Sequence, residues 1–168
     1  IFCCPRCKSD LNLLEGVLTC DSCDDHFPIL GGIPQLFCSN QWDESKKDVT
    51  NAIKSFYEKT PFPNYDQIDD VASLRMKASK SLFGKWLDEQ IPFGTRILEC
   101  GCGTGQLTNF LSLSSRTAIG TDICMNSLGL ASRFKELNEL KRAYFCQMNL
   151  FNPCFKKETF DLVIANGV

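Results

Sequence analysis

The chain has 168 residues, with 18 basic and 20 acidic side chains and a formal net charge of −2 at pH 7. Apolar residues make up 43% of it and charged residues 23%, values that exclude a wholly disordered chain. No apolar run approaches the ~20 residues of a membrane span, and no signal-peptide pattern opens the sequence. We therefore expect no membrane partner, and the near-neutral charge predicts no broad basic face for nucleic acid.

Eleven cysteines accompany a single histidine, His26. An odd number of cysteines cannot all pair, and Cys100 and Cys146 fall within predicted core strands, as reduced thiols commonly do. We therefore expect a reducing, cytoplasmic compartment, and metal binding rather than a framework of disulfides.

Three regions are expected in chain order. Residues 1–37 form a small cysteine-rich module, 38–95 a linker with two helices, and 96–168 the main domain. In the linker, apolar residues at helical spacing predict one helix over 46–57. A second helix begins at Asp70, a favourable N-cap, and continues to the stop signals at Pro92 and Gly94.

Residues 96–168 alternate between strand and helix patterns. Strands are expected over 96–100, 117–122, 143–150 and 160–165, and helices over 106–113 and 126–138. This alternation predicts an α/β fold, a Rossmann-like doubly wound parallel sheet, of which the chain contains four strands.

Two C-x-x-C pairs lie in the first region, Cys4 with Cys7 and Cys20 with Cys23. Two such turns can direct four thiolates at one ion with the tetrahedral geometry of a structural zinc site. A closed site of this kind leaves no position for water, so we expect a structural metal. A module this small has little core of its own, so chelation is expected to unfold residues 1–37 and leave the sheet largely intact.

Alternatives to this metal site stay open. The four thiols could pack in a small core without a metal, or serve in redox chemistry. Cys3 is a spare thiol beside the site that could compete as a ligand. His26 is expected at the surface rather than at the metal.

The first region resembles a known type of zinc ribbon. The shared pattern is CPxC at residues 4–7, CxxC at 20–23, FPI at 27–29 and GIPxL at 32–36. Zinc-ribbon partners of tRNA and protein methyltransferases are similar, as is the ribbon of bacterial ribosomal RNA guanine methyltransferases. The resemblance implies a link to methylation, with the ribbon structural or substrate-positioning. The stretch 27–36 itself predicts a short strand and a Gly-Gly turn that close the ribbon.

A glycine loop, Glu-Cys-Gly-Cys-Gly-Thr-Gly at residues 99–105, follows the first predicted strand of the main domain and opens a helix. Gly101, Gly103 and Gly105 let the backbone turn tightly and approach a ligand without a Cβ in the way. The amides at the start of the helix suit a carboxylate or phosphate. Gln106 stands where dinucleotide binders have their later glycine, and the Gly-Lys-Ser/Thr of a P-loop is absent.

Polar side chains follow the other predicted strands. Asp122 ends the second strand, where a carboxylate can accept hydrogen bonds from both hydroxyls of a ribose. Asn149 and Asn166 end the third and fourth strands. Ligands of parallel sheets bind beyond the carboxyl ends of the strands, so these residues and the glycine loop are expected to converge.

Over about residues 97–168 the chain resembles class I S-adenosylmethionine-dependent methyltransferases. This resemblance implies an enzyme that binds S-adenosylmethionine through Glu99, Gly101, Cys102, Gly103, Gly105, Asp122, Ile123, Asn149 and Asn166. The loop from Glu99 would face the methionine part, and Ile123 the adenine. Asp122 would hold the ribose hydroxyls, Asn149 the adenine amino group, and Asn166 would lie near the sulfonium. The family usually has an aspartate at the position of Asn149.

The predicted function is methyl transfer to an RNA, a protein or a small molecule, and no catalytic base is indicated. The resemblance to this family implies a sheet of seven strands, whereas four are expected here. Residues 1–168 are therefore expected to be part of a larger or divided enzyme and inactive alone. Its open sheet edge predicts self-association. One alternative is a non-catalytic zinc-ribbon partner or activator of another methyltransferase. The other is a nucleotide-dependent oxidoreductase.

Residues 62–65, Phe-Pro-Asn-Tyr, lie between the two predicted linker helices. In one interpretation they fold over the mouth of the cofactor or substrate site, with Tyr57 or Tyr65 as a wall. In the other, their aromatic rings only pack the linker against the core.

Overall fold

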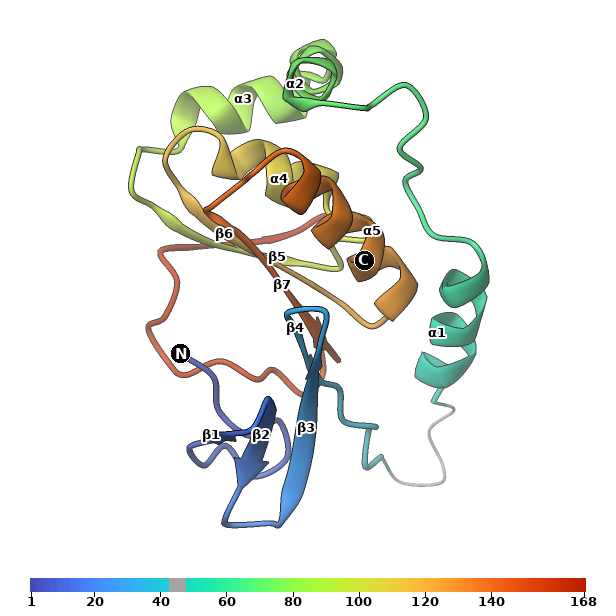
Figure 1. Ribbon diagram of the computed structural model, residues 1–168, viewed down its shortest axis with the longest axis vertical. Coiled ribbons are helices and arrows are strands. Elements are labelled where there is room, and N and C mark those ends of the chain that lie inside the picture. Colours follow the sequence, from blue (N-terminus) through green and yellow to red (C-terminus); the bar gives the residue numbers. More distant parts are fainter. Residues whose placement is uncertain (43–47) are drawn as a thin grey trace.

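The computed structural model describes residues 1–42 and 48–168, whose strands form one eight-stranded sheet in the order β1-β2-β3-β4-β7-β6-β5-β8 (Figure 1). Four of these strands form the parallel sheet of the main domain: β5 (Arg96–Cys100), β6 (Thr117–Asp122), β7 (Ala143–Met148) and β8 (Leu162–Ala165). The predicted Rossmann-like parallel sheet is confirmed. Its last two strands are shorter than the sequence pattern predicts.

Two helices connect the parallel strands, α4 (Gln106–Ser112) and α5 (Met125–Leu137). Both pack on the same face of the sheet, against β6 and β7 (Figure 1). Their bounds agree within a residue with the predicted helices. Because α4 begins directly after the glycine loop and α5 directly after Asp122, both helix starts lie at the carboxyl edge of the sheet.

The linker contains three helices, α1 (Thr50–Lys59), α2 (Val71–Lys80) and α3 (Leu82–Gln90). The predicted N-cap is present, since Asp70 accepts a hydrogen bond of 2.8 Å from the Ser73 amide. The predicted second helix is nevertheless broken at Ser81, which is extended and whose hydroxyl caps α3 through the Gly84 amide. Residues 46 and 47 of the predicted first helix lie outside the described residues.

None of the helices in the described ranges combines the length and the apolar character needed to cross a lipid bilayer.

The ribbon is continuous with the sheet. Its antiparallel strands β1 (Asn12–Leu14), β2 (Val17–Cys20) and β3 (Asp25–Leu30) lead through a Gly-Gly turn into β4 (Ile33–Leu36). The strand and turn are as predicted, but β4 also pairs in parallel with β7, with Leu36 opposite Met148. No local sequence pattern predicts this pairing, which covers the edge of β7.

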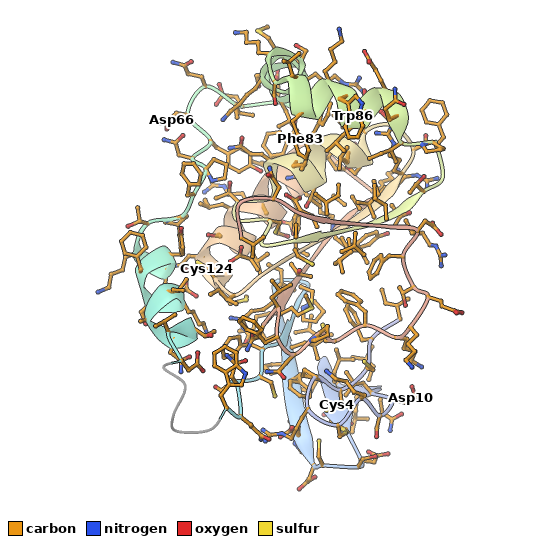
Figure 2. The ribbon with its side chains drawn as sticks, turned by 180° about the vertical axis from the view of Figure 1, so that it is seen from behind. Cys4, Asp10, Asp66, Phe83, Trp86 and Cys124 are labelled. Atoms are coloured by element: carbon orange, nitrogen blue, oxygen red, sulfur yellow. The ribbon has the colours of Figure 1, made fainter. Side chains whose placement is uncertain are left out.

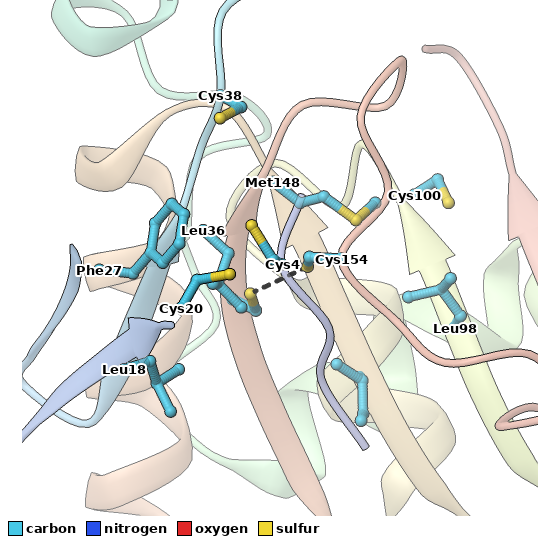
Figure 3. Packing of buried hydrophobic residues seen from close by; sticks show 12 residues of the cluster. Cys4, Leu18, Cys20, Phe27, Leu36, Cys38, Leu98, Cys100, Met148 and Cys154 are labelled. Atoms are coloured by element: carbon cyan, nitrogen blue, oxygen red, sulfur yellow. Dashed lines mark hydrogen bonds between the residues drawn. The ribbon is translucent and has the colours of Figure 1, made fainter. Parts of the chain in front are cut away.

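The two parts share one hydrophobic core (Figure 3). The ribbon contributes Cys4, Leu18, Cys20, Phe27 and Leu36, and the parallel sheet contributes Leu98, Cys100, Ile119, Cys146 and Met148. All of these side chains are buried. The ribbon is therefore energetically part of the main fold rather than a separate appendage.

Arg116 anchors the end of α3 to the sheet from a position that is only 1% exposed. Its Nη1 lies 2.7 Å from the Asp88 carboxylate, and its Nη2 donates to the carbonyls of Asp88 and Ile91, each at 2.6 Å. A buried guanidinium satisfied in this way neutralises a carboxylate and caps the helix end at once. It fixes the outer layer formed by α2 and α3 above α4 (Figure 1).

Candidate functional site

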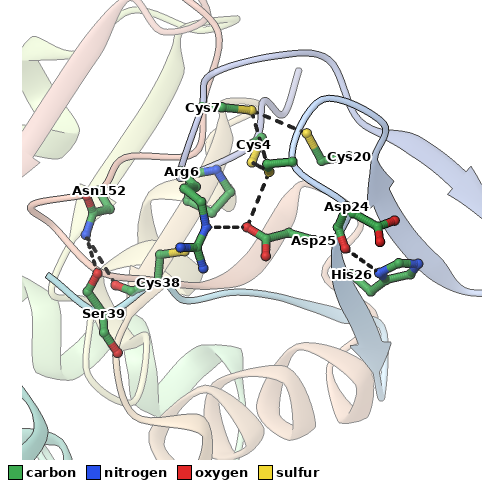
Figure 4. A network of polar contacts seen from close by, with 12 residues as sticks. Cys4, Arg6, Cys7, Cys20, Asp24, Asp25, His26, Cys38, Ser39 and Asn152 are labelled. Carbon is green, nitrogen blue, oxygen red and sulfur yellow. Dashed lines mark hydrogen bonds and ion pairs between the residues drawn. The ribbon is translucent and has the colours of Figure 1, made fainter. Parts of the chain in front are cut away.

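The structure brings the four predicted metal ligands together at one point of the ribbon (Figure 4). Sulfur atoms lie 3.4 Å apart between Cys7 and Cys20, 3.5 Å between Cys4 and Cys23, and 3.7 Å between Cys7 and Cys23. In a tetrahedral zinc site with bonds of about 2.3 Å, the sulfurs are about 3.8 Å apart. The cluster therefore fits a zinc ion with little rearrangement.

The two other candidate ligands lie outside this cluster. Cys3 is buried, and its backbone forms an isolated antiparallel β-bridge with that of Asp10. The Nδ1 of His26 lies 2.9 Å from the Asp24 carbonyl, on the exposed surface (Figure 4). The cluster of four thus agrees with the predicted ligand set.

A cavity of about 810 Å³ opens at the carboxyl ends of the parallel strands, where ligands of such sheets bind. Its volume is in the range of small-molecule sites. The predicted residues that line it are Glu99, Gly101, Cys102, Gly103, Asp122, Ile123, Asn149 and Asn166. Eight of the nine predicted cofactor residues are therefore gathered around one space.

Gly105 is the ninth, and the structure places it beside the cavity rather than on its wall. It is the N-cap of α4, with a φ of 71°. A Cβ there would lie 2.6 Å from both Ala131 and the Phe145 ring. A glycine at this position therefore lets α4 start close against the sheet and α5, and its contact with the cofactor stays a prediction.

Asp122 joins the two turns that shape the cavity. Its carboxylate accepts 2.9 Å hydrogen bonds from the amides of Gly103, in the glycine loop, and Cys124, at the start of α5. Burial raises the pKa of this carboxyl group, while both backbone hydrogen bonds act in the opposite direction. A carboxylate offers about four lone-pair positions, so two remain to accept hydroxyl groups of a ligand.

Glu99 is a buried acid at the methionine end of the predicted site. It accepts a hydrogen bond from the Thr108 hydroxyl, and the Thr121 hydroxyl donates to its carbonyl at 3.1 Å. Burial raises the pKa of Glu99 to about 7. A neighbouring cation would favour the ionised form, so this side chain is suited to an ammonium group.

Asn149 has structural partners in addition to its place on the cavity wall. Its Nδ2 donates at 2.8 Å to the Cys38 carbonyl and to Asn40 Oδ1, while its Oδ1 accepts from the Phe151 amide at 3.1 Å. Both amide hydrogens are thus used to hold the segment after β4. One lone pair of Oδ1 remains to accept an adenine amino group, which is the part of the predicted role that these contacts allow.

The linker supplies walls of the cavity that the sequence predicts only in part. Tyr57 lines it as one interpretation proposed, and Ile53 lies beside it on α1. Phe62 also lines the cavity, whereas Tyr65 packs on Phe134 with ring centroids 5.0 Å apart. Each interpretation of residues 62–65 is therefore right for part of the segment.

Leu74 of α2 and Phe83 of α3 line the far wall of the cavity, a role that was not predicted for them. Phe83 points from α3 toward the body of the molecule in Figure 2. The sequence signal that could have indicated these residues is an apolar helix face longer than the core of one small sheet requires.

Two family models match the chain. Residues 97–168 match the model described as methyltransferase domain, and residues 1–32 match Trm112p-like protein. The first of these ranges contains the glycine loop, Asp122 and Asn166, and the second contains all four cysteines of the metal cluster.

Curated relatives include the ribosomal protein L11 methyltransferases of Neisseria meningitidis and of Janthinobacterium sp. Each is 34% identical over 83 residues, which is 49% of this chain and 26% of the relative. The chain thus spans about a quarter of the length of these relatives.

Solved structures show the same fold. Phosphoethanolamine N-methyltransferase 1 of Haemonchus contortus matches 68% of this chain, and 24% of its own, at a TM-score of 0.50 and 15% identity. A proposed S-adenosyl-L-methionine-dependent methyltransferase of Methanococcus maripaludis matches 75% of this chain, and 54% of its own, at the same score and identity. The two family models, together with the glycine loop and the cysteine cluster, support a class I, S-adenosylmethionine-dependent methyltransferase domain over residues 97–168, preceded by a Trm112p-like ribbon.

Proposed function

We propose that the protein transfers the methyl group of S-adenosylmethionine to an acceptor, and that its ribbon holds a structural zinc ion. The observation that carries this proposal is the convergence of Glu99, Asp122 and Asn166, from three different strands, on one cavity beside a G-x-G-x-G loop. A purely structural strand–helix turn would not require a buried acid, Glu99, and a half-buried one, Asp122, to line the same space.

The residues around the cavity fit this cofactor. Asp122 keeps two acceptor positions for ribose hydroxyls, and the Glu99 carboxylate lies where it can pair with an ammonium group. Ile53, Tyr57 and Ile123 provide apolar walls for a purine. The bound cofactor supplies an activated methyl group, so the chain's own contribution is to align the two reactants and exclude water.

The cavity continues beyond these residues toward α2 and α3, where Leu74, Ala78 and Phe83 line it with Lys77. We assign this end to the acceptor. The likeness to ribosomal protein L11 methyltransferases supports a protein acceptor. Incubation of the full-length protein with methyl-labelled cofactor and separate ribosomal protein, RNA and small-molecule fractions tests this assignment, and label in RNA or small molecules alone would contradict it.

Titration calorimetry tests the cofactor itself. S-adenosylhomocysteine is expected to bind at the cavity, and NAD, which prefers the G-x-G-x-x-G spacing, is expected not to bind. Binding of NAD without S-adenosylhomocysteine would replace this proposal by the oxidoreductase alternative. Binding of S-adenosylhomocysteine without methyl transfer to any fraction would support the non-catalytic alternative.

Substitution of Asp122 by alanine is expected to weaken S-adenosylhomocysteine binding by about 1.5–3 kcal/mol, roughly 10- to 150-fold, because charge-assisted hydrogen bonds to the ribose are lost. Calorimetry measures the change. Asp161→Ala is the matched control, since Asp161 also accepts a backbone amide, that of Arg96 at 2.8 Å, but does not line the cavity. Equal affinities for the two variants would remove Asp122 from the cofactor site.

Cofactor affinity is expected to rise with pH up to about 7 and then level off. The pKa of Glu99 is raised to about 7 by burial, so below that pH the acid must lose a proton before it can pair with an ammonium group. The loss approaches tenfold per pH unit on the acidic side. Calorimetric titrations of S-adenosylhomocysteine between pH 5.5 and 8.5 measure the profile.

Glu99→Gln separates this effect from other titrations, and its profile is expected to be flat. The raised pKa also means that Glu99 contributes stability below the unfolded value of about 4.3, and this contribution is lost as the pH rises through about 7. The ligand-free variant should therefore melt above the unchanged protein at pH 8. An identical pH slope in both proteins would assign the titration to another group.

We further propose that the protein works in a reducing compartment and that it self-associates. None of the eleven cysteines, all of which lie in the described residues, forms a disulfide, and this supports a reducing compartment such as the cytoplasm. Among the described strands, β8 pairs with β5 alone, so self-association would use the outer edge of β8. The edge at β7 is covered by β4.

A further inference from the structure

Residues 58–65, here called the strap, connect the last turn of α1 with the loop before α2. The strap contacts both turns that shape the cavity, the glycine loop at 101–105 and the β6–α5 turn at 122–125. Neither of its end residues, Glu58 and Tyr65, lines the cavity. The contacts at the two ends are of different kinds.

At the first end, Glu58 binds the start of α5. Its two carboxylate oxygens accept the amides of Met125 at 2.8 Å and Asn126 at 3.1 Å, and Asn126 Nδ2 donates to the Glu58 carbonyl at 2.6 Å. A carboxylate is favourable at a helix N-terminus, where backbone amides lack partners within the helix. Figure 2 shows Cys124, the N-cap of α5, next to α1.

The amide of Cys124 is bound by Asp122 instead. The first amides of α5 are therefore divided between a carboxylate of the cavity and a carboxylate of the strap. Because Glu58 holds α1 at this point, it also places Ile53 and Tyr57, one helical turn apart on α1, at the cavity wall.

At the second end, the strap binds the polar groups of Thr104, which is buried in the middle of the glycine loop. The Thr104 hydroxyl donates to the Pro63 carbonyl at 2.5 Å, and its amide to the Phe62 carbonyl at 3.3 Å. The Tyr65 hydroxyl donates to the Thr104 carbonyl at 2.8 Å. Three strap residues thus form hydrogen bonds with the amide, the hydroxyl and the carbonyl of one loop residue, Thr104.

The fit between the strap and the loop is close. A Cβ on Gly103 would lie 2.1 Å from the Phe62 carbonyl oxygen, so a glycine is required there by the strap as well as by its φ of 53°. Tyr65 is held in turn by Asn109 Nδ2, at 3.2 Å from its hydroxyl, and by stacking on Phe134. The strap therefore holds the loop in place at Gly103 and Thr104.

We propose that the strap positions the two cofactor-binding turns relative to each other, with Glu58 and Tyr65 as positioning residues that act through α5 and Thr104. The inference rests on the proposed function, because the cofactor is what spans the two turns. Preorganised turns bind more tightly, since the ligand does not have to order them.

Tyr65→Phe tests the second end, because it removes only the hydroxyl and keeps the ring on Phe134. We expect S-adenosylhomocysteine to bind about three- to tenfold more weakly, the effect of one lost hydrogen bond. Amide hydrogen exchange in the glycine loop of the ligand-free protein should become faster. Tyr144→Phe is the matched control, since that exposed hydroxyl also donates to a carbonyl, that of Lys141 at 3.1 Å, away from the cavity.

Glu58 tests the first end. Glu58→Ala removes both acceptors and Glu58→Gln keeps one, so affinity should fall in the order unchanged protein, Gln, Ala, with Glu89→Gln as the surface control. A lower melting temperature with unchanged affinity and unchanged exchange would show a merely structural role and overturn the inference. If the unchanged protein fails to bind S-adenosylhomocysteine, the proposed function falls, and the strap's role in cofactor binding falls with it.

Discussion

Removal of the metal from the ribbon is expected to destabilise the parallel sheet as well as residues 1–37. Structural zinc contributes on the order of 10 kcal/mol or more to the small modules that bind it. Two of the four cysteines, Cys4 and Cys20, are buried in the same core as Leu98 and Met148. Because β4 also pairs with β7, the loss should reach the edge of the cavity at Asn149.

This replaces the expectation from the sequence that chelation leaves the sheet largely intact. Thermal unfolding, hydrogen exchange of β7 and S-adenosylhomocysteine affinity, each measured with and without a strong chelator, test it. Cys4→Ala and Cys38→Ala form a matched pair, since both cysteines are buried in the shared core and only Cys4 belongs to the metal cluster. Cys38→Ala should cost about 1–3 kcal/mol. Unchanged exchange of β7 after chelation would contradict the coupling.

Replacement of Arg116 by methionine is expected to destabilise the protein by about 2–4 kcal/mol, because Arg116 is buried and its acceptors lose their donor, while Asp88 remains partly solvated with a side chain 34% exposed. The change removes the guanidinium donors from the carbonyls of Asp88 and Ile91 and leaves the Asp88 carboxylate with the Ser114 hydroxyl. Methionine retains much of the side-chain volume, so the loss reflects the polar contacts rather than a cavity. Denaturant unfolding measures it.

Arg96→Met is the control for this prediction. Arg96 pairs with Asp161 at 2.8 Å, about the same distance, but both side chains are about half exposed to solvent. An exposed pair is screened by water and contributes little, so its loss should be far smaller. Similar losses for the two variants would show that Arg116 contributes little beyond an ordinary surface ion pair.

The elements of residues 96–168 were predictable because each carries its own local signal. The strands are short apolar runs, and the helices follow at once after Gly105 and Asp122, where the chain must turn. Ser81 shows the limit of this approach. Apolar residues continue at helical spacing on both sides of it, from Leu74 to Leu87, and only the cap of the Ser81 hydroxyl on Gly84 separates two helices.

The cofactor residues on the strands were predictable for a geometric reason, since the carboxyl ends of parallel strands share one edge. The contacts of the linker and the ribbon were not. Gln35 pairs with Gln147 and Glu58 with Met125, across long separations in the sequence that no local pattern reports. The packing of Gly105 against Ala131 and Phe145 was likewise not predictable, because both neighbours are distant in the sequence.

The parallel pairing of β4 with β7 joins two modules of one polypeptide. A tethered strand faces its partner at an effective concentration of about millimolar, whatever the amount of protein present. Docking of the ribbon is therefore independent of dilution, and its stoichiometry with the methyltransferase domain is fixed at synthesis. A separate subunit in the same place would associate and dissociate with its supply, so covalent linkage makes the completed sheet insensitive to expression level.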